Sequence, residues 1–294
     1  MKKDITELFV LIDDFCKSVN LHHKNMLTTG NQRLRIKTRT TQMSMSEIIT
    51  VILLYYRSPC KNFKYFYQSY LQLYKSDMPN LVSYERFVAL KSRSLPYLIL
   101  LMHLLIQESR DTNISFIDSS SLLVCHIKRS KRNKVFAGIA KLGKSTKGWF
   151  HGLKLHLVIN NLGEIQGLKL TPGNVDDRPP TKNMVKNLTG LLFGDKEYIS
   201  KSLFQDLYQN GLKLVTGIKK TMKNKLMPPF EKIMLRKRAI IETVFDYLKN
   251  KFEIEHLRHR SPINAFVHIL ATLVSYSLKK SKPQVGMTSA HFLS

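Results

Sequence analysis

Acidic residues are scarce in this chain of 294 residues. It contains 21 Asp and Glu against 47 Lys and Arg, so the formal net charge is +26. Basicity of this size is typical of proteins that bind a polyanion, and nucleic acid is the first candidate. A membrane surface is the second candidate, but the sequence contains neither a basic amphipathic helix nor a lipidation signal.

Cysteines, long apolar runs and a glycine-rich phosphate loop are also missing or few. The three cysteines lie far apart without a Cys-x-x-Cys pair, which argues against a zinc finger and a disulfide framework and favours a reducing cytoplasm. The apolar runs that start at Tyr97 and Phe266 are too short to span a bilayer, and the charged N-terminus excludes a secretion signal. The absent phosphate loop excludes a Rossmann fold.

The first part of the chain, residues 1–112, has the apolar spacing of helices. Ser44 and Ser46 precede one apolar run and are candidate helix caps. Arg33 and Arg35 belong to a basic segment between two predicted helices, where a solvated loop and a phosphate contact are both open readings. We expect an all-helical, DNA-binding region.

From residue 113 the pattern changes to strands. "ISFIDSSSLLV" is the first, "GWFHGLKLHLVIN" alternates with period two, and "IQGLKLTP", "GLLFGDKEYI" and "LKLVTGI" follow, with helices after the third and fourth. The segments "RKRAIIETVFDYLKNKFEI" and "INAFVHILATLVSYSLKK" are predicted as helices. This order predicts an α/β domain of the ribonuclease H-like class over residues 113–280, with a mixed five-stranded sheet, and a disordered tail over 281–294.

Three acids occupy positions that call for an explanation. Asp118 ends an apolar run in the first predicted strand, Asp195 follows the fourth, and Glu242 lies in a late helix flanked by basic residues. Each has an ordinary alternative as a cap, turn residue or exposed helix residue, and Glu197 or Asp246 are alternative acids. Converging carboxylates repel one another, and divalent cations relieve that repulsion. Two Mg²⁺ (or Mn²⁺) ions held by these acids would suit phosphodiester chemistry.

The helix of Glu242 carries two basic residues near the acid. On an ideal α-helix Arg238 lies about 40° and Lys249 about 20° from Glu242 around the axis, so the three share a face. That face is either an exposed surface with intrahelical ion pairs or a surface that meets DNA. A further basic cluster, with Lys128, Arg129, Lys131 and Arg132, is expected to hold phosphates.

Three other features carry weaker hypotheses. His151 and His156 lie on a predicted strand, where local hydrogen bonding is favoured over metal binding. "HLRHR" from His256 is better explained as a phosphate-contacting patch than as a zinc site. Trp149, the only tryptophan, is most simply a packing residue at the start of a strand.

These segments together resemble bacterial insertion-sequence transposases of the DDE superfamily, with insertion-sequence family 982 as the nearest match. The resemblance covers residues 5–278 and is carried by the following stretches: "SEIITVILLYYRSPCKNFKYFY", "LVSYERFVAL", "FIDSSSLLVCHIKR", "GWFHGLKLHLVIN", "LTPGNVDDR", "GDKEY" and "RAIIETVFDYLK". It implies that Asp118, Asp195 and Glu242 are the catalytic, metal-binding triad. Arg238 and Lys249 match a recurring arginine and lysine, whereas Leu235 stands where related transposases have tyrosine and Glu197 stands where glycine is usual.

The expected function is a transposase that cuts at the ends of its element and joins the 3′-OH to target DNA with two metal ions. The resemblance implies a nucleoid-associated bacterial protein, terminal inverted repeats and target DNA as partners, and a homodimer in the DNA complex; no membrane partner is expected. Two alternatives stay open. One is a DNA-binding remnant or repressor with an impaired catalytic domain, and the other is a metal-dependent nuclease without strand transfer.

Overall fold

The chain is divided into two compact units. The computed structural model describes residues 2–29, 41–145, 148–218, 222 and 226–285. Backbone contacts group Met1–His103 with Ile263–Ser275 in one unit, and Leu104–Pro262 with Tyr276–Ser294 in the other. The helix α10 (Pro262–Ser277) therefore belongs mainly with the N-terminal helices, whereas the expected boundary at residue 112 placed it with the sheet.

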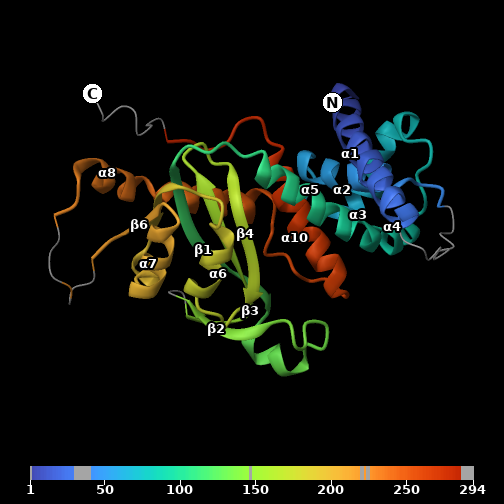
Figure 1. Ribbon diagram of the computed structural model, residues 1–294. Coiled ribbons are helices and arrows are strands. Elements are labelled where there is room, and N and C mark those ends of the chain that lie inside the picture. Colours follow the sequence, from blue (N-terminus) through green and yellow to red (C-terminus); the bar gives the residue numbers. More distant parts are fainter. Residues whose placement is uncertain (1, 30–40, 146–147, 219–221, 223–225, 286–294) are drawn as a thin grey trace. The chain divides into compact units, whose positions relative to one another are not determined.

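The first unit is helical, as predicted (Figure 1). Ser44 caps the second helix with a full capping box: its side chain accepts from the Glu47 N–H, and the Glu47 carboxylate accepts from the Ser44 N–H. Ser46, the other candidate cap, is buried and donates to Asp13 instead. The remaining bounds are α1 (Lys2–Thr29), α2 (Met45–Arg57), α3 (Phe63–Tyr65), η1 (Phe66–Tyr70), η2 (Leu71–Asp77), α4 (Tyr84–Lys91), η3 (Ser92–Ser94) and α5 (Leu95–Gln107).

One helical stretch is longer than the sequence pattern indicated. Residues Tyr84–Gln107 run through α4, η3 and α5 for 24 residues, and in the described part of the chain this is the one helix long and apolar enough to cross a membrane. Length and composition alone are weak grounds for such a role, because buried helices of soluble proteins have the same properties.

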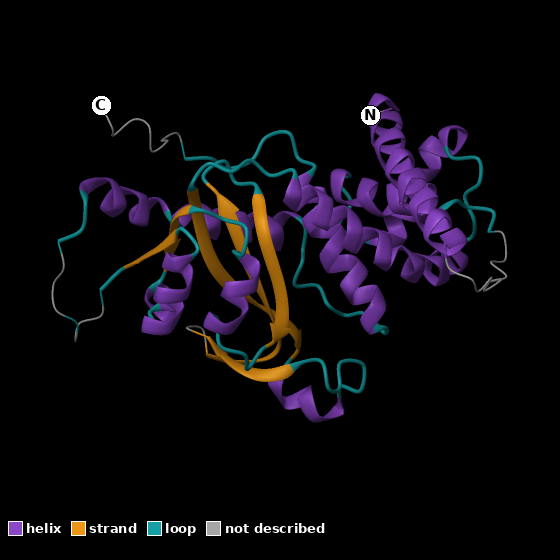
Figure 2. Ribbon diagram, in the orientation of Figure 1, coloured by secondary structure: helices purple, strands orange, loops and turns teal. Residues whose placement is uncertain are grey.

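The second unit is built on a six-stranded sheet, drawn in orange in Figure 2. The strands are β1 (Ile114–Cys125), β2 (Lys141–Ser145), β3 (Gly148–Asn160), β4 (Ile165–Pro172), β5 (Gly190–Gly194) and β6 (Leu212–Thr216). The order is β2-β3-β1-β5-β6, and β4 also pairs with β3. The other elements are η4 (Ile127–Arg132), α6 (Arg178–Met184), η5 (Lys196–Tyr198), α7 (Lys201–Gln209), α8 (Pro229–Lys237), α9 (Ala239–Asp246) and η6 (Tyr247–Lys251).

The five predicted strands are all present and define a ribonuclease H-like domain. Without the short strand β2, which the sequence analysis did not predict, the order is β4-β3-β1-β5-β6. The strands β1, β3 and β4 pair antiparallel, while β1, β5 and β6 pair parallel. The central strand β1 thus carries antiparallel partners on one side and parallel partners on the other, and helices flank the sheet.

The helix expected from Arg236 onward is interrupted. The structure has α8 up to Lys237, a turn at Arg238, α9 up to Asp246 and then the π-helical turn η6. A π-helical turn has more residues per turn than an α-helix. The helical-wheel argument therefore holds for Arg238 and Glu242 but not for Lys249, which lies beyond the change in pitch.

The tail expected at residues 281–294 begins with an ordered stretch. Val285 is buried, and its N–H donates to the Asn161 carbonyl 2.7 Å away in the turn after β3. Residues 286–294 lie outside the described part of the chain.

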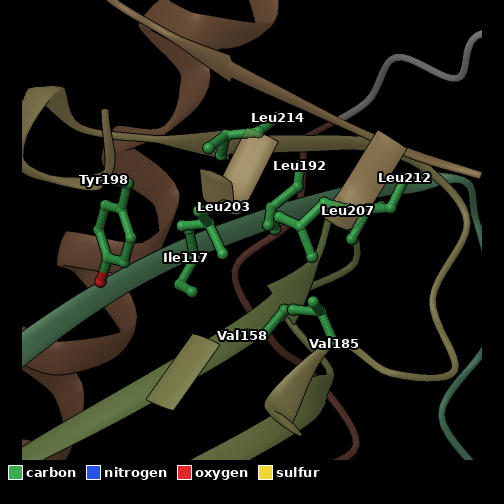
Figure 3. Close-up of a cluster of buried hydrophobic side chains, with 9 residues drawn as sticks. All are labelled: Ile117, Val158, Val185, Leu192, Tyr198, Leu203, Leu207, Leu212 and Leu214. Atoms are coloured by element: carbon green, nitrogen blue, oxygen red, sulfur yellow. The ribbon is translucent and has the colours of Figure 1, made fainter. Parts of the chain in front are cut away.

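One face of the sheet is covered by α6 and α7 (Figure 1). Figure 3 shows the apolar cluster between the sheet and these helices, in which Ile117 and Leu192 from neighbouring strands meet Leu203 and Leu207 from α7. The ring of Tyr198 closes the cluster beside Gly194, where an added Cβ would lie 3.1 Å from the ring and 3.2 Å from Ile117. This packing fixes the middle of β1 and the end of β5, which carry the first two acids of the candidate site.

We predict that Leu192→Ala lowers the free energy of unfolding by about 2–5 kcal/mol, because it leaves a cavity in this cluster. Leu226, 98% exposed in the same unit, provides the matched control, and Leu226→Ala should stay within about 0.5 kcal/mol. Urea denaturation of both variants checks this. Similar losses for the two would show that the cluster is not a stabilising core.

Candidate active site

Asp118 and Asp195 occupy equivalent positions on two neighbouring parallel strands. Phe116 of β1 pairs with Phe193 of β5, with ring centroids 5.6 Å apart. Each acid follows its phenylalanine by two residues, so the period-two geometry of a strand puts both beyond the same pair of rings. Asp118 lies within the longer strand β1, whereas Asp195 lies just past the end of β5.

The Asp118 carboxylate is 21% exposed. Burial raises its pKa to about 6; the Ser119 N–H and the Arg238 guanidinium oppose the rise, and the negative charge of Asp195 adds to it. Asp195 itself starts the short helix η5 and accepts the Glu197 N–H at 2.9 Å. The two carboxylates therefore act on each other electrostatically.

Arg238 connects the first acid to the third. Its Nη1 donates to Asp118 Oδ2 at 2.9 Å, and its Nη2 donates to Glu242 Oε1 at 3.1 Å. The helix α9 that carries Glu242 packs against β1, which explains how residues 120 positions apart meet. Glu242 is 60% exposed and lies in the first turn of α9, where the helix dipole favours a negative charge.

Asp118 and Glu242 thus meet at one guanidinium, and Asp195 lies near enough to Asp118 to raise its pKa. Among the described residues no group of three or more His, Cys, Asp or Glu side chains is close enough to form a metal site. The donor chemistry nevertheless fits a divalent cation: the carboxylates are oxygen ligands of the kind that Mg²⁺ prefers. Burial disfavours the charged form of Asp118, and a bound cation would favour it.

The other predicted contacts are more scattered. Lys249 forms an ion pair with Glu255 at 2.5 Å and does not join Arg238. Arg33 and Arg35 lie outside the described residues.

The basic cluster of η4 lies at the far end of β1 from the acids. From Asp118 to Cys125 the strand runs for seven residues, or about 23 Å at its usual rise. Lys128, Arg129, Lys131 and Arg132 come after that end. The cluster was expected to hold phosphates; a phosphate held there would lie away from the acids, and the role itself stays a prediction.

Sequence reasoning missed a buried polar network on the other face of the sheet. Lys154 Nζ donates to Asp177 Oδ1 at 3.0 Å and to the Val175 carbonyl at 3.1 Å. His156 Nδ1 lies 3.6 Å from the same Asp177 oxygen, while its Nε2 lies 2.8 Å from the Thr171 hydroxyl. The sequence signal for this network was the alternation of Lys154 and His156 together with the acid pair in "NVDDR". The contact itself could not be predicted, because it depends on how β3 pairs with β4.

Burial lowers the pKa of His156 to about 4, and the nearby Lys154 charge acts in the same direction while Asp177 opposes it. His156 is therefore neutral at pH 7, bonded to Thr171, and belongs to no group of metal ligands among the described residues. Its local hydrogen bonding agrees with the reading favoured from the sequence.

The fold defines the class of protein: a ribonuclease H-like domain, the architecture of metal-dependent polynucleotidyl transferases. A family model described as "Transposase DDE domain" matches residues 108–262, more than half of the chain. The chain belongs to this family, whose members generally use divalent metal ions and bind DNA. No protein in the curated set matches the chain.

We predict that Arg238→Gln lowers the free energy of unfolding by about 1–3 kcal/mol at pH 8 without metal, because the partly buried Asp118 carboxylate loses its cation. Arg178 forms a similar bond to Asp176 at 2.7 Å, but both side chains are about half exposed. Arg178→Gln should therefore change stability by less than about 0.5 kcal/mol. Chemical denaturation measures both, and equal effects would contradict the compensating role of Arg238.

A second prediction concerns acid stability. Since the pKa of His156 falls from 6.5 in the unfolded chain to about 4 in the folded one, the unfolded state binds the proton more readily between these values, and stability is lost as pH falls through this window. Lowering the pH from 7 to 5 should reduce the free energy of unfolding of the native chain by about 1–2 kcal/mol more than it reduces that of the His156→Gln variant. His126→Gln, at an exposed histidine, should behave like the native chain. Unfolding curves at both pH values decide this.

Proposed function

We propose that this protein is an insertion-sequence transposase that cuts phosphodiesters at the ends of its element and joins the released 3′-OH to target DNA. The observation that supports the proposal most directly is the bonding of Asp118 and Glu242 to Arg238, with Asp195 close enough to act electrostatically on Asp118. These acids come from the central strand, the end of its parallel neighbour and a helix packed on that strand. Within the DDE transposases we propose insertion-sequence family 982, which the sequence motifs resemble.

In this proposal Asp118, Asp195 and Glu242 hold two divalent ions, Mg²⁺ or Mn²⁺. When bound, such ions activate the attacking oxygen and stabilise the leaving oxygen of a phosphodiester. The protein's own part is to hold three carboxylates on rigid elements and to supply positive charge. Arg238, bonded to two of the acids, is placed to exchange those contacts for a phosphate of the bound DNA.

The two reactions need the same site but different nucleophiles. Water attacks first and leaves a 3′-OH on the element; that hydroxyl then attacks a target phosphodiester, the P–O bond to the target's 3′ oxygen breaks, and no ATP is required. The helical first unit would recognise the terminal inverted repeats, and two ends would be held by two copies of the chain. Lys249 and the cations of η4 would contact DNA away from the reacting phosphate.

We predict that Asp118→Asn, Asp195→Asn and Glu242→Gln each reduce Mg²⁺-dependent cleavage by at least about 100-fold, because each removes a metal-binding charge. The substrate is DNA that carries the sequences flanking the coding region. Asp246→Asn is the matched control, since Asp246 is an exposed acid of the same helix that bonds to Asn250. Its activity should stay within about threefold of the native chain.

A pre-cut substrate separates the proposed function from its alternatives. Joining of the 3′-OH to a second duplex identifies a transposase, while cleavage without joining identifies a nuclease. DNA binding without either reaction identifies a remnant or repressor. Full activity in any one of the three acid variants would refute the three-acid site.

A further inference from the structure

Trp149, the only tryptophan in the chain, lies on the surface. It is 59% exposed, whereas the next residue, Phe150, is 4% exposed. Consecutive residues of a strand point to opposite faces, and Phe150 takes the inner one. Trp149 is thus not the packing residue that the sequence suggested.

The inner side of the β2–β3 hairpin leaves no room for a second large ring. Gly143 pairs with Phe150, and a Cβ on this glycine would lie 2.1 Å from the Gly173 carbonyl oxygen and 2.9 Å from the Phe150 ring. The hairpin is packed without Trp149. An indole that contributes little to the core, yet exposes a large apolar surface, is typical of a binding surface.

The neighbours of Trp149 indicate an anionic partner. Lys144 is its direct cross-strand partner, and the Lys144 Nζ lies 5.8 Å from the centre of the ring. The next pair on the same face of the strands is Leu142, which is also exposed, and His151. A flat ring flanked by a cation provides both stacking and charge, the combination by which proteins bind single-stranded nucleic acid.

The wider surroundings in the sequence contain basic residues and no acidic ones. Residues 119–163 contain nine Lys and Arg and no Asp or Glu, and the basic helix η4 packs against β3. A protein partner for such a surface would have to be strongly acidic. Nucleic acid supplies negative charge and flat rings together, so the observations favour it.

We propose that Trp149 and Lys144 form a stacking site for unpaired DNA bases, separate from the three acids. The proposal rests on the DNA-processing function given above. Trp149 lies two residues from His151, which pairs with Cys125 at the far end of β1. Asp118 pairs with Leu157, eight residues from Trp149 along β3, so by the rise of a strand Trp149 is about 26 Å from Asp118, a distance of about eight base pairs along a duplex. Bases must be unpaired or displaced to stack there, because their faces are covered in an intact duplex.

The lone tryptophan makes the test direct, because its fluorescence reports on this position alone. The native chain is titrated in EDTA, which prevents cleavage, with oligo(dT), with a blunt duplex and with the same duplex containing a mismatched bubble. Stacking quenches indole emission, so oligo(dT) and the bubble should quench it saturably and the blunt duplex much less. Anisotropy of labelled DNA measures binding independently of the tryptophan.

Variants separate stacking from charge and from folding. Trp149→Ala should weaken oligo(dT) binding about tenfold, and Trp149→Phe should recover most of it because the ring is retained. Lys144→Gln should weaken binding to all three DNAs. It should also reduce the slope of log affinity against log salt concentration by about one. Tyr208, an equally exposed ring on α7 whose near neighbour is Asp206, is the control, and Tyr208→Ala should bind normally. All variants should melt within about 2 °C of the native chain.

The outcomes distinguish this site from the proposed function. If DNA binds by anisotropy while the emission is unchanged and Trp149→Ala binds like the native chain, the stacking site is refuted and the transposase proposal stands. If none of the DNAs binds, both proposals fail. Emission that changes with protein concentration and not with DNA would assign Trp149 to a contact between copies of the chain, which also overturns the stacking site.

Discussion

The carboxylate of Asp118 lies in the central strand of the sheet, where burial makes its charged form costly. The surrounding architecture determines what can compensate it. The parallel neighbour β5 brings a second acid to the same level, and α9 brings Arg238 and a third. The guanidinium of Arg238 supplies positive charge to two of these acids. The same demand for positive charge is what a divalent metal ion satisfies.

Much of this arrangement followed from the sequence because it depends on local patterns. Apolar runs ending in a lone acid, and period-two alternation in "GLKLHLVIN", were enough to predict five strands in a ribonuclease H-like order. The capping box at Ser44 was equally local. The three acids were predicted from their placement on the first strand, the fourth strand and a late helix, and from the family resemblance.

The parts that sequence did not predict depend on contacts between distant residues. The segment Lys141–Ser145 has no alternation of its own and is a strand only because it pairs with the outer half of β3. Helix propensity favours continuation through Arg238 and Tyr247, so the turn and the π-helical change of pitch could not be seen. The orientation of Trp149 was also hidden, since two adjacent aromatic residues compete for one inward position and the glycines opposite decide which takes it.

The Lys154–Asp177 ion pair has a consequence for how such a chain can change over time. Its two members are separated by 23 positions and lie in a mostly buried place. Losing either alone leaves the other charge without a counterpart, which is far more damaging than losing both. Substitutions at these two positions are therefore tolerated mainly when both change together. Among relatives the two positions should co-vary, even where the rest of the β4–α6 connection diverges freely.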